Sequence, residues 1–206
     1  EPIGAFIGWK TLGLFQTETD VDNWAAQNGA EAGDIRFSDE YSDGVIDEKD
    51  RTIIGYAQPK FTASFNNTIR WKGLDAEIYF QGVYGNTIFN VTKVDMTSMN
   101  TICNQYASVK DRWTGEGTSN SMPRAIYGDP NNNTRPSDRY LEDGSYLRLK
   151  NLTVGYTLPA SVTNKIKVSS LRFFASASNL FTLTSYSGFD PEVGESSIDW
   201  GTYPIT

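Results

Sequence analysis

The sequence predicts an all-β chain built on two antiparallel hairpins, four strands in all, with long loops that carry short helices. Three observations support this fold class. Two pairs of segments alternate apolar and polar residues with a period of two, the pattern of strands whose two faces differ. A short connection joins the members of each pair, whereas the remaining connections run to tens of residues. Aromatic residues make up 13% of the chain, mostly Tyr and Phe, a composition that favours strands over a helical bundle.

The N-terminal part of the chain precedes the hairpins. Residues 1–16 are apolar and interrupted by glycine, which predicts short extended segments rather than one long strand. A short helix is expected over residues 19–26, because Thr19 or Asp20 can cap its start. An acidic loop over residues 33–55 follows this helix.

The first hairpin is predicted over residues 60–86. Apolar residues alternate with polar ones from Phe61 to Trp71, and the alternation restarts over residues 74–84 after Lys72-Gly73. A two-residue turn that ends in glycine joins two strands of about ten residues, which is the pattern of a tight hairpin. One face is expected to carry Phe61, Phe65, Ile69, Trp71, Leu74, Ile78 and Phe80, and the other Thr62, Ser64, Asn66, Arg70, Asp75, Glu77 and Gln81.

A long polar loop over residues 87–144 separates the two hairpins. Residues 104–113 have the pattern of a short helix, whereas residues 129–136 (Asp-Pro-Asn-Asn-Asn-Thr-Arg-Pro) read as irregular loop. The second hairpin is predicted over residues 145–184, with a short polar connection at 159–170, and a further loop over residues 185–206 follows it.

The first strand of the second hairpin contains a slip in its alternation. Leu147 and Leu149 are odd-numbered, but the apolar residues from Leu152 onward are even-numbered. One extra residue near Lys150-Asn151 would keep all of them on one face, so the sequence predicts a β-bulge there.

The asymmetry of the connections narrows the fold to two candidates. Outer-membrane β-barrels have short turns on the periplasmic side and long loops on the extracellular side, and strands of about ten alternating residues fit their tilted span. In a soluble β-sandwich the same alternation would face a core on one side and water on the other. Both readings remain open at this level, although an isolated pair of hairpins would leave open edges that need partners.

The overall composition excludes several functions. The chain has 25 acidic against 18 basic residues, which argues against nucleic acid as a partner because phosphate binding needs a basic surface. It lacks histidine, and Cys103 is its only cysteine, so a Ser-His-Asp triad, the usual zinc sites and an internal disulfide are excluded. No apolar run reaches the roughly 20 residues of a transmembrane helix. No signal peptide is visible at the first residues.

Residues 39–50 are rich in carboxylate side chains, and their pattern resembles an EF-hand-type calcium loop. Carboxylates stand at loop positions 1, 5, 9 and 12, and glycine stands at position 6, where the backbone must turn sharply. Position 3 is Tyr41 rather than Asp or Asn, and position 12 is Asp rather than Glu. The alternative is a solvated acidic turn whose side chains cap their own backbone. The predicted ligands of a structural calcium ion are the side chains of Asp39, Asp43, Asp47 and Asp50 and the carbonyl of Val45.

Several long motifs, in the same order along the chain, resemble SusC/RagA-type TonB-linked outer-membrane transporters. The strongest is Tyr-Leu-Glu-Asp-Gly-Ser-Tyr-Leu-Arg-Leu-Lys-Asn-Leu-Thr-Val-Gly-Tyr over residues 140–156. The resemblance covers essentially the whole chain, and its other segments are residues 33–37, the acidic loop, 50–55, 59–61, 80–86, 178–182 and 188–192.

The resemblance implies that the chain is the C-terminal part of such a transporter, in the bacterial outer membrane. Its barrel would be plugged by an N-terminal domain and lidded by a SusD-like surface lipoprotein, and it would import oligosaccharides or peptides with energy from TonB. The plug, the TonB-contacting region and the final strand are expected to lie outside this sequence. The apolar face of the hairpins would contact lipid, the polar face would line the lumen, and the acidic loop would be extracellular. The protein would not be an enzyme.

Two other functional classes remain as alternatives. The chain could be a soluble, calcium-stabilised β-sandwich module that binds glycans, or a carboxylate-based glycosidase, for which Asp75 and Glu77 are neighbours on one strand face. Aromatic side chains in the loops offer flat apolar faces for sugar rings, and the candidates are Trp113, Tyr127, Tyr186 and Trp200.

Overall fold

The computed structural model describes residues 4–192 and 198–199. The chain divides into two compact units. We call them the sheet unit, which comprises residues 59–86 and 143–187, and the loop unit, which comprises the described parts of residues 1–58, 87–142 and 188–203.

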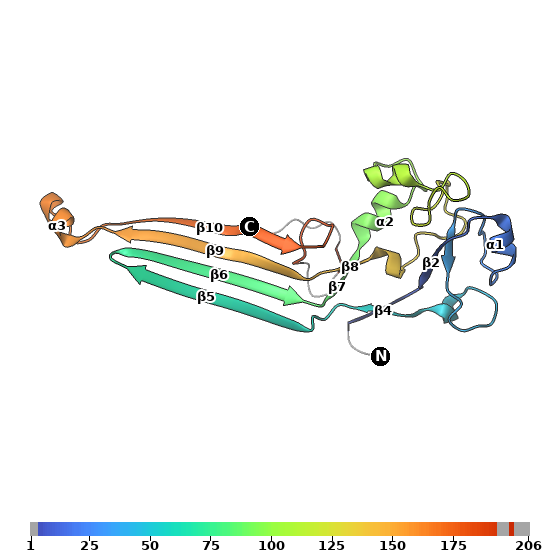
Figure 1. The fold of residues 1–206 in the computed structure, drawn as a ribbon, viewed down its shortest axis with the longest axis horizontal. Helices are drawn as coiled ribbons and strands as arrows, with labels where there is room; N and C mark the ends of the chain where they lie inside the picture. Colours follow the sequence, from blue (N-terminus) through green and yellow to red (C-terminus); the bar gives the residue numbers. More distant parts are fainter. Residues whose placement is uncertain (1–3, 193–197, 200–206) are drawn as a thin grey trace. The chain divides into compact units, whose positions relative to one another are not determined.

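The sheet unit is a single four-stranded antiparallel sheet (Figure 1). Both predicted hairpins are present, and the second strand of the first hairpin pairs with the first strand of the second. The described strands form this open sheet and no closed barrel. In the order in which they lie side by side, the strands are β10 (Arg172–Thr184), β9 (Tyr146–Thr157), β6 (Leu74–Tyr84) and β5 (Phe61–Trp71).

The β5–β6 turn consists of Lys72 and Gly73, which both have left-handed backbones with φ of 48° and 87°. Two successive positive φ angles are typical of the type I′ turn, whose twist matches that of the flanking strands. The turn also packs closely against the end of β9, where the Thr157 amide donates to the Gly73 carbonyl at 2.7 Å. A Cβ at position 73 would lie 2.6 Å from the Thr157 carbonyl oxygen, so both the conformation and the contact require glycine.

The predicted β-bulge in β9 is confirmed. Tyr79 of β6 is opposite Asn151, but the next residue, Phe80, is opposite Leu149, so Lys150 is the extra residue. Facing β10, Ser178 is opposite Asn151 and Phe181 is opposite Leu149, so β10 carries one residue more than β9 at the same level. The insertion keeps the apolar residues of β9 on one face over its whole length.

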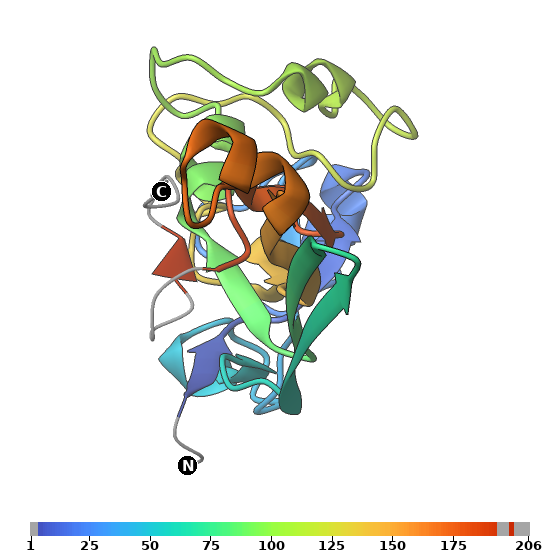
Figure 2. The same cartoon turned by 90° about the vertical axis from the view of Figure 1, so that its left-hand side faces the viewer.

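The two ends of the sheet differ in their connections. At one end lie the β5–β6 turn and the β9–β10 connection, which contains α3 (Ala160–Thr163) and the 3-10 turn η4 (Asn164–Ile166) rather than a plain polar loop (Figure 2). At the other end, the chain leaves β6 and returns to β9 through residues 86–144. The Gly144 amide donates to the Asn86 carbonyl at 2.9 Å, so this long excursion begins and ends at hydrogen-bonded neighbours.

The loop unit is held by three small sheets and an apolar cluster. The cluster consists of Trp9, Leu14, Ile35, Phe37 and Ile46, with Ala25 and Trp113 packed against it. The sheets pair β1 (Ala5–Gly8) with β4 (Thr52–Tyr56), β2 (Thr11–Leu14) with β3 (Ile35–Phe37), and β7 (Thr87–Asn90) with both β8 (Leu141–Asp143) and β11 (Ile198–Asp199).

The helices of the loop unit differ from their predicted bounds. The predicted helix over residues 19–26 is α1 (Glu18–Asp22), and its cap is Thr17 rather than Thr19 or Asp20. Thr17 and Asp20 form a reciprocal capping box, which fixes the earlier start. The predicted helix over residues 104–113 is a 3-10 segment, η2 (Ala107–Asp111). The remaining helical segments are α2 (Val91–Thr97), which was not predicted, η1 (Glu48–Asp50) and η3 (Asp138–Tyr140).

No helix in the described residues combines the length and the apolar character needed to cross a membrane.

A buried network of side-chain amides ties residues 129–136 to the rest of the loop unit. Asn133 accepts from the Ile35 amide at 2.8 Å and donates to Asp34 at 2.9 Å. Asn131 donates to Asn133 at 2.8 Å and accepts from Gln27 at 2.6 Å. All four side chains are buried, and each hydrogen bond satisfies a group that would otherwise be unpaired. The segment is irregular loop, as the sequence indicated, but two of its asparagines are buried in the loop unit.

Arg124 completes this network from its edge. Its guanidinium donates to both carboxylate oxygens of Asp34, at 3.1 and 3.0 Å, and forms an ion pair with Glu31 at 2.5 Å. Although burial lowers the pKa of Arg124, its hydrogen bonds to the carboxylates of Asp34 and Glu31 and the charges of these groups outweigh burial and raise the pKa above its usual value. The bidentate contact supplies a positive charge to Asp34, which is fully buried and would be costly to ionise alone.

Candidate functional site

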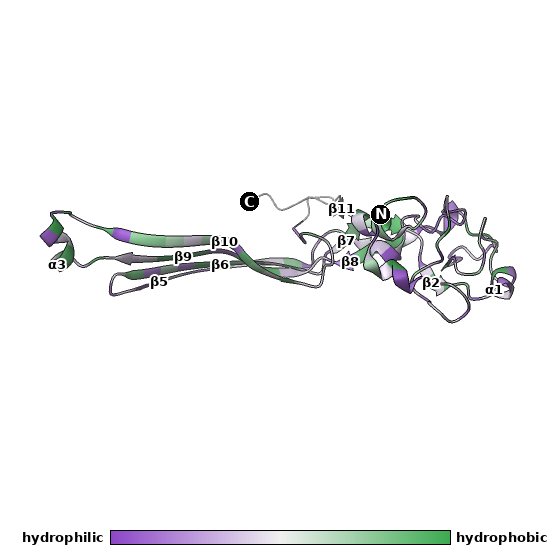
Figure 3. Ribbon diagram, turned by 90° about the horizontal axis from the view of Figure 1, so that it is seen from above, coloured by the Kyte–Doolittle hydropathy of each residue, from purple (hydrophilic) through white to green (hydrophobic). Residues whose placement is uncertain are grey.

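The sheet has one apolar and one polar face, as the alternation predicts. Residues that are paired across neighbouring strands lie on the same face of the sheet, and most pairs join apolar with apolar or polar with polar positions. Figure 3 colours the sheet by hydropathy. The apolar face carries Phe61, Phe65, Ile69, Trp71, Leu74, Ile78, Phe80, Leu147, Leu149, Leu152, Val154, Tyr156, Phe173, Phe181 and Leu183.

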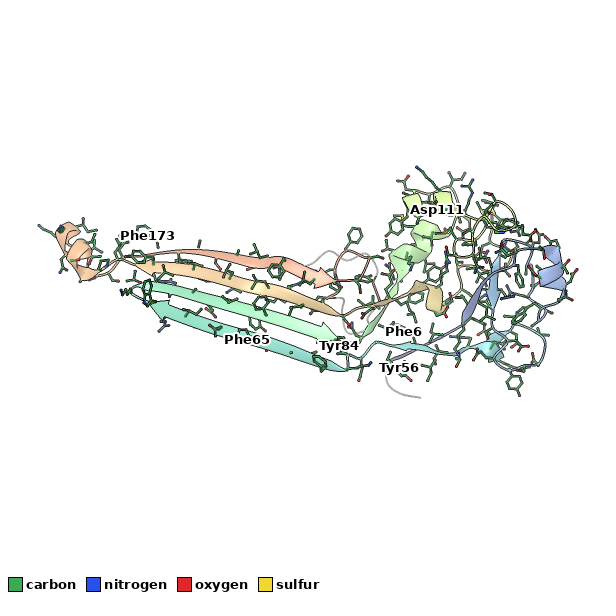
Figure 4. The ribbon with its side chains drawn as sticks, viewed as in Figure 1. Phe6, Tyr56, Phe65, Tyr84, Asp111 and Phe173 are labelled. Atoms are coloured by element: carbon green, nitrogen blue, oxygen red, sulfur yellow. The ribbon has the colours of Figure 1, made fainter. Side chains whose placement is uncertain are left out.

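Much of this apolar face is exposed. Phe61 and Phe65 expose 57% and 58% of their surface, and Phe173 exposes 61%. Figure 4 labels Phe65 on β5 and Phe173 on β10. Burial of large apolar side chains normally stabilises a fold, and water-soluble monomers rarely expose a contiguous apolar patch of this kind. A face built in this way needs an apolar environment or a partner.

Aromatic side chains bound the apolar face at both ends. At the end with the short connections, Trp71, Leu74, Tyr156 and Phe173 follow one another across the four strands in a single row. At the opposite end, Phe61 and Tyr84 are paired, with ring centroids 5.3 Å apart.

The polar face is linked across strands by hydrogen bonds. Thr153 and Ser176 share one at 2.9 Å, and Arg148 donates to Thr182 at 2.8 Å. Near the short connections, Arg172 of β10 reaches over β9 to Asp75 of β6, with contacts of 3.0 and 2.5 Å. Gly155 makes this crossing possible, because a Cβ there would overlap the Arg172 guanidinium.

The two carboxylates considered for a glycosidase lie on this polar face. Both oxygens of Asp75 are bonded to Arg172, and Glu77 accepts a long hydrogen bond of 3.5 Å from Asn66. A retaining or inverting pair needs one carboxyl group that can hold a proton at its working pH. A carboxylate paired to arginine favours its charged form, so Asp75 is poorly suited to that role.

In the acidic loop, the four carboxylates that were predicted to bind calcium accept hydrogen bonds from backbone amides of the loop itself. Asp39 accepts from the amides of Ser42 and Gly44, at 2.6 and 2.9 Å. Asp50 is fully buried and accepts from the amides of Tyr41 and Asp47, at 3.0 and 2.8 Å. The remaining two carboxylates cap nearby amides: Asp43 accepts from Val45 at 3.2 Å and Asp47 from Lys49 at 2.7 Å.

A lysine side chain lies among these carboxylates. The Lys49 ammonium is 3.2 Å from Asp43 and 3.8 Å from Asp47. The hydrogen bond to Asp43 and the charges of both carboxylates raise the pKa of Lys49. Among the described residues, no three His, Cys, Asp or Glu side chains are grouped so as to hold a metal ion. The observed geometry is that of a turn whose carboxylates cap its own backbone. A calcium ion would have to compete with backbone amides for the carboxylate oxygens and displace the Lys49 ammonium.

The acidic loop is also fixed to the apolar cluster of the loop unit. Ile46 is buried in the cluster, and its amide donates to the Ala26 carbonyl at 2.9 Å. The Trp9 indole donates to the Asp47 carbonyl at 3.0 Å. Val45, whose carbonyl was predicted to be a ligand, has an exposed side chain and pairs with Ala26 in an isolated parallel bridge.

The four aromatic residues considered for sugar binding have different environments. Trp113 packs against the apolar cluster and donates to Gln16 at 3.2 Å, so it serves the interior of the loop unit. Tyr186 is buried, whereas Tyr127 exposes 83% of its surface. Trp200 lies outside the described residues. Of the three described candidates, Tyr127 alone presents an open ring.

A hollow of about 450 Å³ beside α2 had no signal in the sequence. It involves Val94, Asp95 and Met96 of the helix and Thr134, which is distant in sequence. Polar residues of the segment after α2, Ser98, Asn100, Thr101, Cys103 and Asn104, complete the lining. It could not be found by pattern, because α2 itself was not predicted and its wall combines two separate parts of the long loop.

Comparison with known proteins places these features in a class. No protein-family model matches the chain. Curated relatives and solved structures do match it. The TonB-dependent receptors P3 and P26 of Formosa agariphila are 34% and 31% identical over 99% and 93% of this chain. The TonB-dependent receptor SusC of Bacteroides thetaiotaomicron is 24% identical over 82% of it.

The fold agrees with that of a solved transporter. A structure of the RagAB peptide transporter superposes with a TM-score of 0.76 at 24% identity and covers 97% of this chain. The chain spans about a fifth of the length of its relatives: 21% of receptor P3, 19% of receptor P26 and 21% of the RagAB chain.

A two-faced antiparallel sheet, long loops at one end and matches along almost the whole chain define the class as TonB-dependent receptors, which are outer-membrane proteins. Within that class, the chain is similar in sequence to SusC and in fold to the RagAB transporter.

Proposed function

We propose that the sheet unit is part of the wall of a closed transmembrane β-barrel, and that the chain belongs to a TonB-dependent importer of oligosaccharides or peptides. The observation that supports this most directly is the exposed apolar face, bounded by aromatic side chains at both ends. Outer-membrane barrels have such a face toward lipid, with aromatic residues at the two interfaces and polar residues toward the lumen.

The length of the apolar face fits this proposal. Phe61 and Trp71 mark its two ends on β5 and are ten residues apart in the strand. At about 3.3 Å per residue this is about 33 Å along the strand. A strand tilted by about 40° spans about 25 Å along the membrane normal, which is the height of the apolar band of an outer-membrane barrel.

The edges of the sheet support a larger closed structure. β5 and β10 each pair on one side within the described residues, so their outer edges carry unpaired backbone groups. In lipid each such group is costly, and only closure satisfies all of them. Further strands from the rest of a barrel would complete the pairing.

The long connections support a role in capture of cargo from outside the cell. In the proposed orientation the short connections are periplasmic and the excursion over residues 86–144 is extracellular. This excursion is where a SusD-like surface lipoprotein and the cargo would bind, and TonB would supply energy through a region outside this sequence.

Heat-modifiability of the complete protein tests the barrel. Expressed with its own leader in a Bacteroidetes host, it should fractionate with outer membranes and require detergent for extraction. An unboiled sample should migrate faster on denaturing gels than a boiled one, because closed barrels resist detergent. A protein that stays in solution without detergent and shows no such shift would remove the basis of the proposal.

Uptake and co-purification test the importer. Deletion of the gene should abolish growth on one class of cargo, oligosaccharide or peptide, and complementation should restore it only when TonB is present. An affinity tag on the protein should retain a surface lipoprotein of the SusD type. Growth that depends on neither TonB nor the gene would contradict import.

The soluble glycan-binding module is less supported. It would need a second layer over the apolar face, yet the large side chains of that face are exposed, including Phe61, Phe65, Trp71, Phe173 and Leu183. Calcium at the acidic loop is kept as a proposal that rests on the spacing of Asp39, Asp43, Val45, Asp47 and Asp50, and its role would be to stabilise the shape of that loop.

A further inference from the structure

The β9–β10 connection exposes apolar and basic side chains together. Val162, Ile166 and Val168 are exposed, although they are apolar, and Lys165 and Lys167 lie between and beside them. The connection leaves the sheet just after Tyr156 and returns just before Phe173, which are paired in the aromatic row of the apolar face. Exposed apolar side chains therefore continue along the chain beyond the last aromatic row.

Charge at this end of the sheet is opposite to that of the chain. The two short connections and the strand ends beside them, residues 70–75 and 157–172, contain five basic residues and one acidic residue. The chain as a whole has a formal net charge of −7. The basic residues are Arg70, Lys72, Lys165, Lys167 and Arg172, and the acidic residue is Asp75.

Lys72 belongs to the apolar side of this end. Its ammonium lies 4.9 Å from the centroid of the Trp71 ring, and Trp71 is on the apolar face. Lys72 and Lys167 both have left-handed backbones, with φ of 48° and 57°, a conformation that favours Asn, Asp or Gly. Each short connection thus places a lysine where a different residue would fit the turn with less strain.

The strand-end arginines face the other way. Arg172 is bonded to Asp75 on the polar face, and Arg70 is paired in register with Asp75 on that same face. Together with the turn they line a hollow of about 480 Å³. The lysines of the two connections, Lys72, Lys165 and Lys167, are exposed and carry the positive charge of this end that does not face Asp75.

We propose that Lys72, Lys165 and Lys167, with the exposed Val162, Ile166 and Val168, form a binding surface for the headgroups of anionic phospholipids. The inference rests on the proposed barrel, because it places this surface at the periplasmic leaflet. Basic side chains next to apolar ones, at the level of an aromatic row, suit the boundary between acyl chains and phosphate groups. The surface would hold the short-turn end of the barrel at a fixed depth.

Native mass spectrometry of the complete, detergent-extracted protein tests this surface. The protein is incubated with an equimolar mixture of phosphatidylglycerol and phosphatidylcholine of the same chain length, and the retained lipids are counted. Wild type should retain phosphatidylglycerol preferentially. One basic side chain near an anionic surface contributes about fivefold in affinity, so removal of two in the K165Q/K167Q variant should reduce the preference by about 25-fold. A K165R/K167R variant should keep it.

The matched control is K110Q/R112Q, which removes two exposed charges at the same spacing, one in the 3-10 segment η2 and one at its C-terminal cap. It should retain phosphatidylglycerol as wild type does. An unchanged preference in K165Q/K167Q, or an equal loss in the control, would overturn the assignment. So would displacement of the lipid by inorganic phosphate but not by chloride of equal ionic strength, because the ligand would then be free phosphate.

Each preparation is first checked for heat-modifiability, which separates two failures. A wild-type protein without that shift fails as a barrel. A heat-modifiable wild type with no preference for phosphatidylglycerol fails at this surface alone.

Discussion

Arginine substitutions along β5 distinguish a lipid-facing wall from a protein core. Phe61 and Phe65 lie on the same face of the same strand and are equally exposed, at 57% and 58%. If only buried apolar area mattered, Phe61→Arg and Phe65→Arg would lower the free energy of unfolding by nearly equal amounts. In a membrane the two substitutions differ, because the free-energy cost of a lipid-facing charge depends on its depth in the bilayer.

The depth follows from the strand geometry. Phe61 is at one end of the apolar face, and Phe65 is four residues, or about 13 Å, further along the strand. At a tilt of about 40° this difference is about 10 Å along the membrane normal, so Phe65 lies close to the midplane. Phe65→Arg should cost about 2–4 kcal/mol and Phe61→Arg about 0–1 kcal/mol.

Equilibrium unfolding in urea of the complete protein, reconstituted in lipid vesicles, measures these costs. The control is Asn66→Arg, which adds the same charge beside Phe65 but on the polar face, and it should change stability by less than about 1 kcal/mol. Equal costs at Phe61 and Phe65 would refute the lipid-facing assignment. A larger cost for Asn66→Arg than for Phe65→Arg would refute the assignment of the two faces.

Three further predictions concern the loop unit. Asn133→Ala leaves several buried hydrogen-bonding groups unpaired and should lower stability by about 3 kcal/mol in thermal unfolding, whereas Asn104→Ala, at an exposed position, should have little effect; similar losses in both would argue against the amide network. Burial raises the pKa of Tyr140 from 10.0 to about 12, so its protonated form is stabilised by folding. That contribution, about 2–3 kcal/mol, is present below pH 10 and is lost as pH rises through about 12, so wild type should lose stability relative to Tyr140→Phe over this range. If the two unfold in parallel, the phenol is not buried. Calcium at a hundredfold excess over its dissociation constant should add about 2.7 kcal/mol of stability, and Asp43→Asn should abolish the gain. If calcium adds no stability, the carboxylates serve only as caps of backbone amides.

The sheet was predictable because its signal is local. The alternation from Phe61 to Trp71 and the Lys72-Gly73 turn define the first hairpin, and both are patterns of residues that are neighbours in the sequence. The bulge at Lys150 was predictable for the same reason, since an inserted residue shifts the parity of every apolar position that follows it.

The loop unit was less predictable because its contacts are distant in sequence. Asn131 and Asn133 are polar and stand between two prolines, a pattern that predicts loop and carries no signal for burial, yet both are buried by partners about a hundred residues away, Gln27 and Asp34. The start of α1 was misplaced because its capping box uses Asp20 in the position where Glu is the stronger signal.

The hydrogen bond between Gly144 and Asn86 has a consequence for how such a chain can diverge. Since the excursion between them leaves and re-enters the sheet at adjacent points, its length does not alter the register of β6 with β9. The entropic cost of a longer loop grows only with the logarithm of its length. Residues 87–143 can therefore change in length and composition while the pairing of β6 with β9 stays the same.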